Sequence, residues 1–431
     1  MRIPRQFLQD ATTVFILFMA TGAFQTVLVD SPDSQATTNG SPTMWLFWLL
    51  LYSIVALRLV PKYREALALV RANKFLFSIV ALAVLSTVWS GDPAFTFRRS
   101  IALLATTLVG VDFAVRYSIR EQLRLLYISL GIFVVLSIAA QLLFPGFVPY
   151  LDFGDEAWHG VLSFKNEWAR VIVLGAIALL CRSRRTRRDS WLTGGLLVVA
   201  TALVLAANSK GSLIVFVAML GFFVLYGTLR WSNKSLIMTC LAALAVAIPT
   251  SYLALQNLDS VTAMLGRDAT LTGRSNLWQL SLESIGRSPI YGYGFAAFWS
   301  ATSQEAMRIR GELNWDAPHA HNGYIDIALA LGLVGLFLYL TAYFVAVRRA
   351  IKRIRENYDL EAIWPLAYLV FIFLCQLTES SIVAGNSIFW VLYVTAACSV
   401  TLPQYTYATL PANGKQLEGS NAELDVLGDY A

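Results

Sequence analysis

Long apolar runs separated by short polar segments dominate the pattern of this 431-residue chain. Such runs are typical of helices that cross a bilayer, because about 20 apolar residues with a rise of about 1.5 Å each span the hydrocarbon. The pattern predicts twelve membrane-spanning helices, at about 11–29, 44–60, 75–90, 100–115, 124–144, 167–181, 191–207, 212–229, 235–255, 324–347, 363–382 and 386–402. We expect an all-α fold, since lipid requires each backbone polar group to be paired within its own segment.

The composition agrees with a polytopic membrane protein, since 57% of the residues are hydrophobic and only 14% are charged. A net charge of +6 would suggest nucleic-acid binding in a soluble protein, but here the basic residues fall mainly in short loops between spans, so no nucleic acid is expected. The four cysteines lie in or at the ends of predicted spans, which does not indicate a disulfide framework: Cys181, Cys240, Cys375 and Cys398.

The distribution of lysine and arginine predicts the topology. The runs RSRRTRR (182–188) and RRAIKRIR (348–355) mark cytoplasmic loops, which places both termini in the cytoplasm. The first apolar run predicts an uncleaved anchor. We expect one transmembrane domain over 1–402, with a periplasmic loop at 256–323, and a disordered cytoplasmic tail at 403–431.

The long periplasmic loop contains one helical pattern. Within GRSNLWQLSLESIGRSP, the side chains of Leu277, Trp278, Ser281, Leu282 and Ile285 recur at helical spacing, and Gly and Pro follow. This segment predicts an amphipathic helix that lies on the outer membrane face or caps a cavity.

Two of the three histidines stand where this loop meets a predicted span, in WDAPHAHNGYIDIALALGLVGLFLYL. Histidine is the natural general base near neutral pH. For His159, which is isolated in another loop, an ordinary surface role is favoured. For His319 and His321, which precede Asn322 and the start of the span, a surface role and a functional role both remain open.

Basic residues on the face that should be poor in them form a second signal. They are Arg98, Arg99, Arg170, Lys210 and Arg274. Cations held at a membrane face cost free energy unless they have partners, and arginine suits phosphate, so the set favours an anion site. Snorkelling to lipid headgroups is the alternative for each residue taken alone.

Two acidic residues also lie near predicted span ends. Glu379 needs a partner, for which a histidine or arginine of the site is the candidate, and Asp326 shares a helix face with Asn322. Structural pairing is favoured for both. The two loop histidines with Asp316 would make an incomplete ligand set, so no metal is expected. A GK[ST] phosphate loop is missing from the sequence, which disfavours ATP-driven transport.

Three runs, LTGRSNLW, SPIYGYGFAAFW and HAHNGYIDIALALGLVGLF, resemble the signature region of the bacterial O-antigen ligase and polysaccharide polymerase family. The resemblance is strongest over about 205–345, and VWSGDPAFTFRR and GVLSFKNEWAR upstream are also similar. It favours the exopolysaccharide-polymerase branch.

The resemblance implies a cofactor-free, metal-independent glycosyltransferase of GT-C-like architecture in the bacterial inner membrane, with its site facing the periplasm. Its substrates would be undecaprenyl-diphosphate-linked oligosaccharides, as donor and acceptor, and a single displacement would invert the anomeric carbon. The match places the catalytic base on His321 or His319, diphosphate binding on Arg274, Lys210, Arg98 and Arg99, and supporting roles on Glu379 and Asn322. Lys210 departs from the family, in which arginine is frequent at this position, because lysine keeps the charge but loses the bidentate fork.

Three other readings stay open beside a polymerase. One is an O-antigen ligase that transfers glycan to a lipid A-core acceptor. Another is a flippase or transporter for lipid-linked sugars, although a transporter would keep its titratable groups at mid-membrane. The third is a scaffold whose large loop binds a chain-length regulator or export protein, which is compatible with catalysis.

Overall fold

The computed structural model describes residues 4–25, 42–144, 157–182, 186–226, 274–357, 359–380 and 382–401. Every regular element in these residues is helical, which confirms the all-α class for this part of the chain. The α-helices are α1 (Arg5–Ala20), α3 (Pro42–Leu59), α4 (Tyr63–Ala72), α5 (Lys74–Leu85), α6 (Pro93–Arg116), α7 (Ile119–Leu143), α8 (Lys165–Leu180), α9 (Arg187–Ala206), α10 (Lys210–Leu225), α13 (Arg274–Arg287), α14 (Gln304–Leu313), α15 (Gly323–Glu356), α16 (Trp364–Gln376) and α17 (Ile388–Ser399).

Within these residues, five helical segments are long and apolar enough to cross a membrane: Thr43–Ala72, Pro93–Arg116, Ile119–Leu143, Arg187–Ala206 and Gly323–Glu356. Shorter apolar helices accompany them at Lys74–Val88, Lys210–Leu225, Leu360–Gln376 and Ile388–Ser399. The helices agree with the predicted membrane protein. The count of twelve spans and the GT-C-like arrangement remain predictions, and the predicted span at 235–255 and the tail at 403–431 lie outside the described residues.

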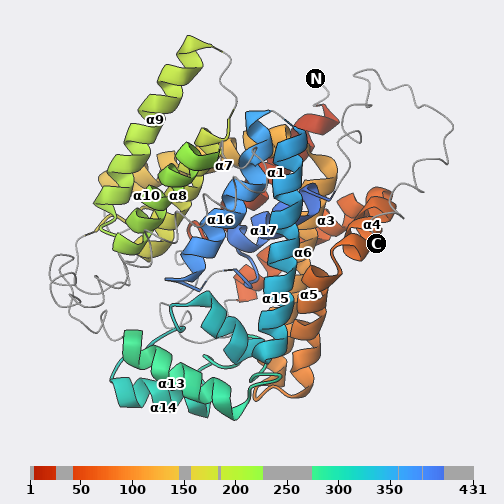
Figure 1. Cartoon of the computed structure of the whole chain (residues 1–431), viewed down its shortest axis with the longest axis vertical. Coiled ribbons are helices and arrows are strands. Elements are labelled where there is room, and N and C mark those ends of the chain that lie inside the picture. The colour runs from red at the N-terminus through yellow and green to blue at the C-terminus, as the bar shows by residue number, and fades with distance from the viewer. Residues whose placement is uncertain are drawn as a thin grey trace.

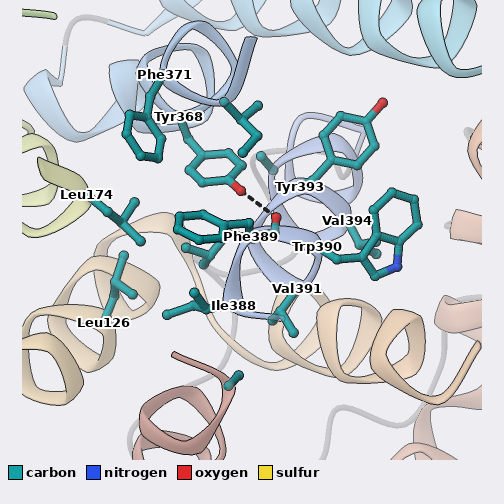
Figure 2. Packing of buried hydrophobic residues seen from close by; sticks show 14 of the residues in the cluster. Leu126, Leu174, Tyr368, Phe371, Ile388, Phe389, Trp390, Val391, Tyr393 and Val394 are labelled. Atoms are coloured by element: carbon teal, nitrogen blue, oxygen red, sulfur yellow. Dashed lines mark hydrogen bonds between the residues drawn. The ribbon is translucent and has the colours of Figure 1, made fainter. Parts of the chain in front are cut away.

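The helices α16 and α17 pack against each other and form the centre of the molecule, with α6 against α17 and α8 against α16. Figure 2 shows this core, in which Trp390 and Tyr393 of α17 lie among apolar side chains and the Tyr368 hydroxyl donates to the Phe389 carbonyl. Trp390, Tyr393 and Tyr368 are fully buried. This packing holds the connection between α16 and α17 in place, and that connection carries Glu379.

The longest helix, α15, is broken near its N-terminal end, and the backbone groups left unpaired there bind to another segment. Gly332 has non-helical dihedrals of φ 67° and ψ −171°. The amides of Tyr293 and Gly294 donate to the carbonyls of Leu329 and Ala330 at 2.9 and 3.0 Å, and the amides that follow the break, Leu333 and Val334, donate to the carbonyls of Pro289 and Ile290 at 2.7 and 3.3 Å. The break therefore costs little, because backbone groups that the helix leaves unpaired find partners in the loop 289–294.

Two glycines make this insertion possible. A Cβ added to Gly332 would lie 2.1 Å from the Ile290 oxygen, and one added to Gly292 would lie 2.6 Å from the Gly332 nitrogen. Both residues also have positive φ, which side-chain-bearing residues rarely adopt. The glycines of the SPIYGYG run and of α15 thus permit a close approach of two backbones.

The helices α13 and α14 lie side by side at one end of the molecule, next to the end of α15 (Figure 1). They enclose a second, smaller apolar cluster that is built on Leu277, Phe298, Ile309, Ala317 and Leu329. The helix predicted between Gly273 and Pro289 is confirmed as α13, and its buried face packs within the protein. The helix α14 was not predicted, because its short apolar pattern is dominated by charged residues.

Some boundaries differ from the prediction. The helix α1 begins and ends earlier than the predicted span 11–29 and is followed by a turn with Gly22 and Phe24 at positive φ. The helix α16 ends at Gln376 rather than near 382, since the amides of Thr378 and Glu379 both turn back to the Cys375 carbonyl. Glu379 therefore lies in a loop. Among the cysteines, Cys181, Cys375 and Cys398 are free and buried, and Cys240 is outside the described residues.

Candidate active site

Five segments that are distant in the sequence meet near the N-terminal end of α15. They are the starts of α8, α10 and α13, the loop 314–322 before α15, and the loop that follows α16. Each contributes polar side chains to one cluster, whose centre is the buried carboxylate of Glu379.

The carboxylate of Glu379 connects a histidine to an arginine. His321 Nδ1 lies 3.2 Å from Glu379 Oε2, and Arg274 Nη2 lies 3.4 Å from Glu379 Oε1. Arg274 Nη2 is also 3.4 Å from His321 Nδ1, and its Nη1 donates to the Thr378 carbonyl at 2.8 Å. Because an ionised carboxylate only accepts, we assign the imidazole proton of His321 to Nδ1. This tautomer leaves Nε2 as the basic nitrogen.

The neighbouring imidazole is arranged differently. His319 Nδ1 accepts a hydrogen bond from the His321 amide at 3.1 Å, so the proton of neutral His319 is on Nε2. That atom is 3.9 Å from Glu379 Oε2, beyond hydrogen-bond distance. The two rings lie 4.1 Å apart. His319 therefore has its acceptor nitrogen occupied by the backbone, whereas in His321 it is the donor nitrogen that is occupied.

The electrostatics of the cluster follow from burial and from these contacts. Burial, followed by the nearby charge of His321, lowers the pKa of His319 to about 3, so His319 is neutral near pH 7. Burial alone would raise the pKa of Glu379, but the His321 hydrogen bond and the charge of Arg170 outweigh it and hold that pKa well below its usual range. The site thus keeps a charged carboxylate beside a neutral imidazole.

Surrounding groups fix the orientation of His321. Trp315 stacks on its ring with centroids 5.5 Å apart and an interplanar angle of 19°. His321 has a positive φ of 49°, and Asn322 follows it as the N-cap of α15, accepting from the amides of Tyr324 and Ile325 at 3.1 and 3.3 Å. Asn322, predicted to support the site, thus acts by setting the start of α15.

The predicted structural pairing of Asp326 is also seen. Its carboxylate accepts from the Trp299 indole at 2.6 Å, from the Ala320 amide at 3.1 Å, and from the Ser380 hydroxyl. Trp278 of α13 donates to the Ala320 carbonyl at 2.8 Å. Asp326 and Trp278 therefore join the histidine loop to α13, α15 and the loop of Glu379.

A cavity of about 1180 Å³ opens beside this cluster. His319, His321 and Glu379 line it, together with aromatic residues such as Trp299 and Trp315. Its volume lies above the usual range of about 300–1,000 Å³ for small-molecule sites, which is enough for a ligand larger than one sugar.

Of the four cations predicted to bind diphosphate, one lines the cavity and three do not. Arg99 lines the cavity, with its guanidinium 5.1 Å from the centre of the Phe95 ring. Arg98 is exposed beside it, and Arg98, Lys210 and Arg274 are not among the described residues that line the cavity. Arg274 lies behind the imidazole and the carboxylate, and Lys210 begins α10 next to Ser209.

Two residues of the KNEWAR run were not in the predicted site set. Asn166 donates to Glu379 Oε1 at 3.3 Å and accepts from the Ser209 hydroxyl at 2.8 Å, so it links α8, α10 and the carboxylate. Arg170, which the sequence placed only among the basic residues of the outer face, is buried in the cavity wall. Their signal in the sequence was a polar segment at the start of an apolar helix.

Three side chains of the cluster are also possible metal ligands. His319, His321 and Glu379 each offer one ligand atom, all within 4.8 Å of one another, and two imidazoles with a carboxylate are a zinc-like set. Glu379 takes the place that the sequence considered for Asp316, which instead pairs with Arg310 at 2.9 Å. The Arg274 guanidinium lies 3.4 Å from His321 Nδ1 and from Glu379 Oε1. A metal cation bound by these residues would be next to this positive charge and would be repelled by it. The arrangement fits a metal poorly.

Known proteins resemble the chain in the region of this site. Residues 195–340, which contain α13, both site histidines and the N-terminal part of α15, match the family model described as O-antigen ligase. The exopolysaccharide production protein ExoQ of Rhizobium meliloti (strain 1021) is 25% identical over 358 residues, which are 79% of this chain and 80% of that protein.

The fold and site define a helical membrane protein with a histidine–glutamate–arginine cluster beside a cavity. The two matches support the family that the sequence predicted. The chain is similar to O-antigen ligases over residues 195–340 and to an exopolysaccharide production protein over most of its length.

Proposed function

We propose that this protein is a metal-independent, inverting glycosyltransferase of the bacterial inner membrane. It polymerises undecaprenyl-diphosphate-linked oligosaccharide repeats into exopolysaccharide or O-antigen on the periplasmic face, with both termini in the cytoplasm. The observation that carries the proposal is the contact of His321 Nδ1 with Glu379, which leaves the basic Nε2 of a cavity-lining histidine for a substrate hydroxyl.

The reaction then proceeds by one displacement. The hydroxyl of the acceptor sugar attacks the anomeric carbon of the donor glycan and transfers its proton to His321 Nε2. The bond between that carbon and the undecaprenyl diphosphate oxygen breaks, and the electron pair leaves with the diphosphate. The imidazolium that forms is stabilised by Glu379, and cations near the cavity stabilise the leaving diphosphate.

The same geometry favours one of the two candidate bases. His319 is neutral, and its acceptor nitrogen already receives the His321 amide. His321 is therefore the base, and His319 orients the backbone at His321.

A ligase that uses a lipid A-core acceptor would need the same base and the same leaving-group site. The similarity to an exopolysaccharide production protein, which covers about four fifths of each chain, favours the polymerase. A scaffold role, with a chain-length regulator or export protein bound to the large loop, is compatible with either activity.

The test is glycan product formation from a purified lipid-linked repeat, with wild type, His321→Ala and His319→Ala at matched expression. Longer chains from wild type and a loss of about a hundredfold or more in His321→Ala are expected. Product that forms only when a lipid A-core acceptor is added would identify a ligase. Equal rates in wild type and His321→Ala would exclude His321 as the base, and transfer of labelled lipid across a vesicle membrane without any glycan product would identify a flippase.

A further inference from the structure

The N-terminus of α8 lies in the wall of the cavity, and the N-terminus of α10 is joined to it from behind the cavity lining. The helix α8 begins at Lys165 and α10 begins at Lys210, and the Ser209 hydroxyl before α10 donates to Asn166 Oδ1 in the first turn of α8 at 2.8 Å. In the described structure, neither first turn has a side-chain cap, because Phe164 has no polar atom and Ser209 uses its hydroxyl on Asn166. Uncapped helix N-termini carry partial positive charge and attract anions.

Arg170 lies beside the first turn of α8, and its side chain gives separate evidence that this part of the cavity binds a ligand. Its side chain is only 5% exposed, and it lines the cavity. Its Nε donates to the Asn166 carbonyl at 3.3 Å, which directs the guanidinium along the first turn of α8 toward the cavity. The guanidinium rests on the Phe389 ring, 5.5 Å from its centre.

The hydrogen bonds of this guanidinium are incomplete. Nη1 of Arg170 is buried and has no hydrogen-bond partner among the described residues. The acidic groups whose charge reaches Arg170 are Glu167 and Glu379, and Glu379 already accepts from Arg274, His321 and Asn166. A buried arginine with an unused donor is costly unless a ligand completes it.

We infer that Arg170 and the N-terminus of α8 form the binding site for a diphosphate group. Arginine and helix amides are suited to phosphate oxygens, and the site is in the wall of the cavity that His321 lines. The inference deepens the proposed function, on which it rests for the identity of the ligand as the leaving diphosphate. It assigns direct contact with the anion to Arg170 and the positioning of Glu379 and His321 to Arg274.

The experiment measures binding by the full-length protein purified in detergent, with inorganic diphosphate as the first probe and undecaprenyl diphosphate as the second. Arg170→Gln removes the charge, Arg170→Lys keeps it, and Arg287→Gln is the matched control on α13, where the arginine is half exposed and pairs with Glu305. We expect Arg170→Gln to weaken both probes by about tenfold or more, Arg170→Lys to weaken them less, and the control to bind as wild type.

Unchanged affinity of Arg170→Gln for both probes would overturn the inference. Vesicles of phosphatidylglycerol serve as a third probe. A loss of binding to these vesicles alone, with binding of both diphosphate probes unchanged, would also overturn the inference, because the site would then take a phospholipid headgroup. If Arg170→Gln does not fold, Arg170→Gln with Glu167→Gln removes the acid left without a cation and carries the same test.

The two proposals fail separately. If diphosphate binding depends on Arg170 but wild type makes no glycan, the binding site stands and the transferase does not. If wild type makes glycan while Arg170→Gln binds diphosphate normally, the transferase stands and this site does not.

Discussion

His321 Nδ1 and Glu379 Oε2 lie 3.2 Å apart although 58 residues separate them in the chain. The carboxylate is buried and charged, so it holds the imidazole in one tautomer and can stabilise the imidazolium that forms when the ring accepts a proton. Arg274 adds a third member, because its guanidinium contacts both of them. The three side chains come from the start of α13, the loop before α15 and the loop after α16.

Glu379→Gln should reduce the rate of glycan transfer by about a hundredfold, because the amide no longer fixes the proton on Nδ1 or balances the charge of protonated His321. The measurement is the turnover of purified variants with a saturating lipid-linked donor. Glu312→Gln is the control, since Glu312 pairs with Arg308 on the surface of α14.

The double variant Glu379→Gln with His321→Ala should be no slower than His321→Ala alone, because the carboxylate acts through the imidazole. Independent losses that multiply in the double variant would mean that Glu379 has a separate role.

Folded stability should fall as the pH decreases from about 7 to 5, and His319 should account for part of the fall. The pKa of His319 is lowered from 6.5 to about 3, so below pH 6.5 the unfolded chain takes up a proton that the folded protein does not. Glu379 acts in a lower window, since a carboxyl with a depressed pKa keeps its stabilising effect until the pH falls below its ordinary pKa of 4.5.

The measurement is the thermal midpoint at several pH values between 7.5 and 5. It compares wild type with His319→Gln, and His159→Gln is the control. His319→Gln should lose less stability over the range than wild type, by up to about 1.4 kcal/mol per pH unit. A pH dependence identical to that of wild type would show that His319 titrates normally.

Gly332→Ala should destabilise the protein by about 2 kcal/mol or more, because the new Cβ would overlap the Ile290 carbonyl and because alanine rarely adopts this backbone conformation. Gly131→Ala in α7 is the matched control, since nothing lies within 4 Å of its added Cβ. Its stability should stay the same or increase. A thermal midpoint for Gly332→Ala at or above that of wild type would mean that α15 does not need the break.

Chelation should leave transfer unchanged, because Arg274 is adjacent to the three possible ligands and opposes a bound cation. The measurement is the rate after dialysis against EDTA, with and without added zinc. If dialysis lowers the transfer rate and added zinc restores it, the partner of Glu379 is a metal ion and not Arg274.

The sequence by itself predicted the features that depend on local pattern. Apolar run length indicated the membrane helices, the spacing of Leu277, Ser281 and Ile285 indicated α13, and the family resemblance indicated the histidine pair. The apolar helices and α13 could be predicted because the period of a helix and the length of a bilayer span are properties of neighbouring residues, whereas the role of the histidine pair stays a proposal.

Contacts between distant segments were decided only by the tertiary structure. The sequence showed Glu379 as a polar residue near a span end, but could not show that it meets His321 and Asn166. It also could not choose between His319 and His321, since the tautomers depend on which atoms the backbone and the carboxylate bring near each ring.

The break in α15 and the burial of Arg170 were also decided only by the tertiary structure. Glycines such as those of SPIYGYG and of α15 occur in many structural contexts. Only their close approach in the folded chain shows that the loop 289–294 pairs the backbone groups left free by the break in α15. In the sequence, Arg170 cannot be distinguished from the other basic residues predicted at the membrane face. Only the structure shows that its guanidinium is buried with an unused donor. A residue's type and place in a helix follow from its neighbours in sequence, whereas its hydrogen-bond partners and burial follow from the packing of the whole chain.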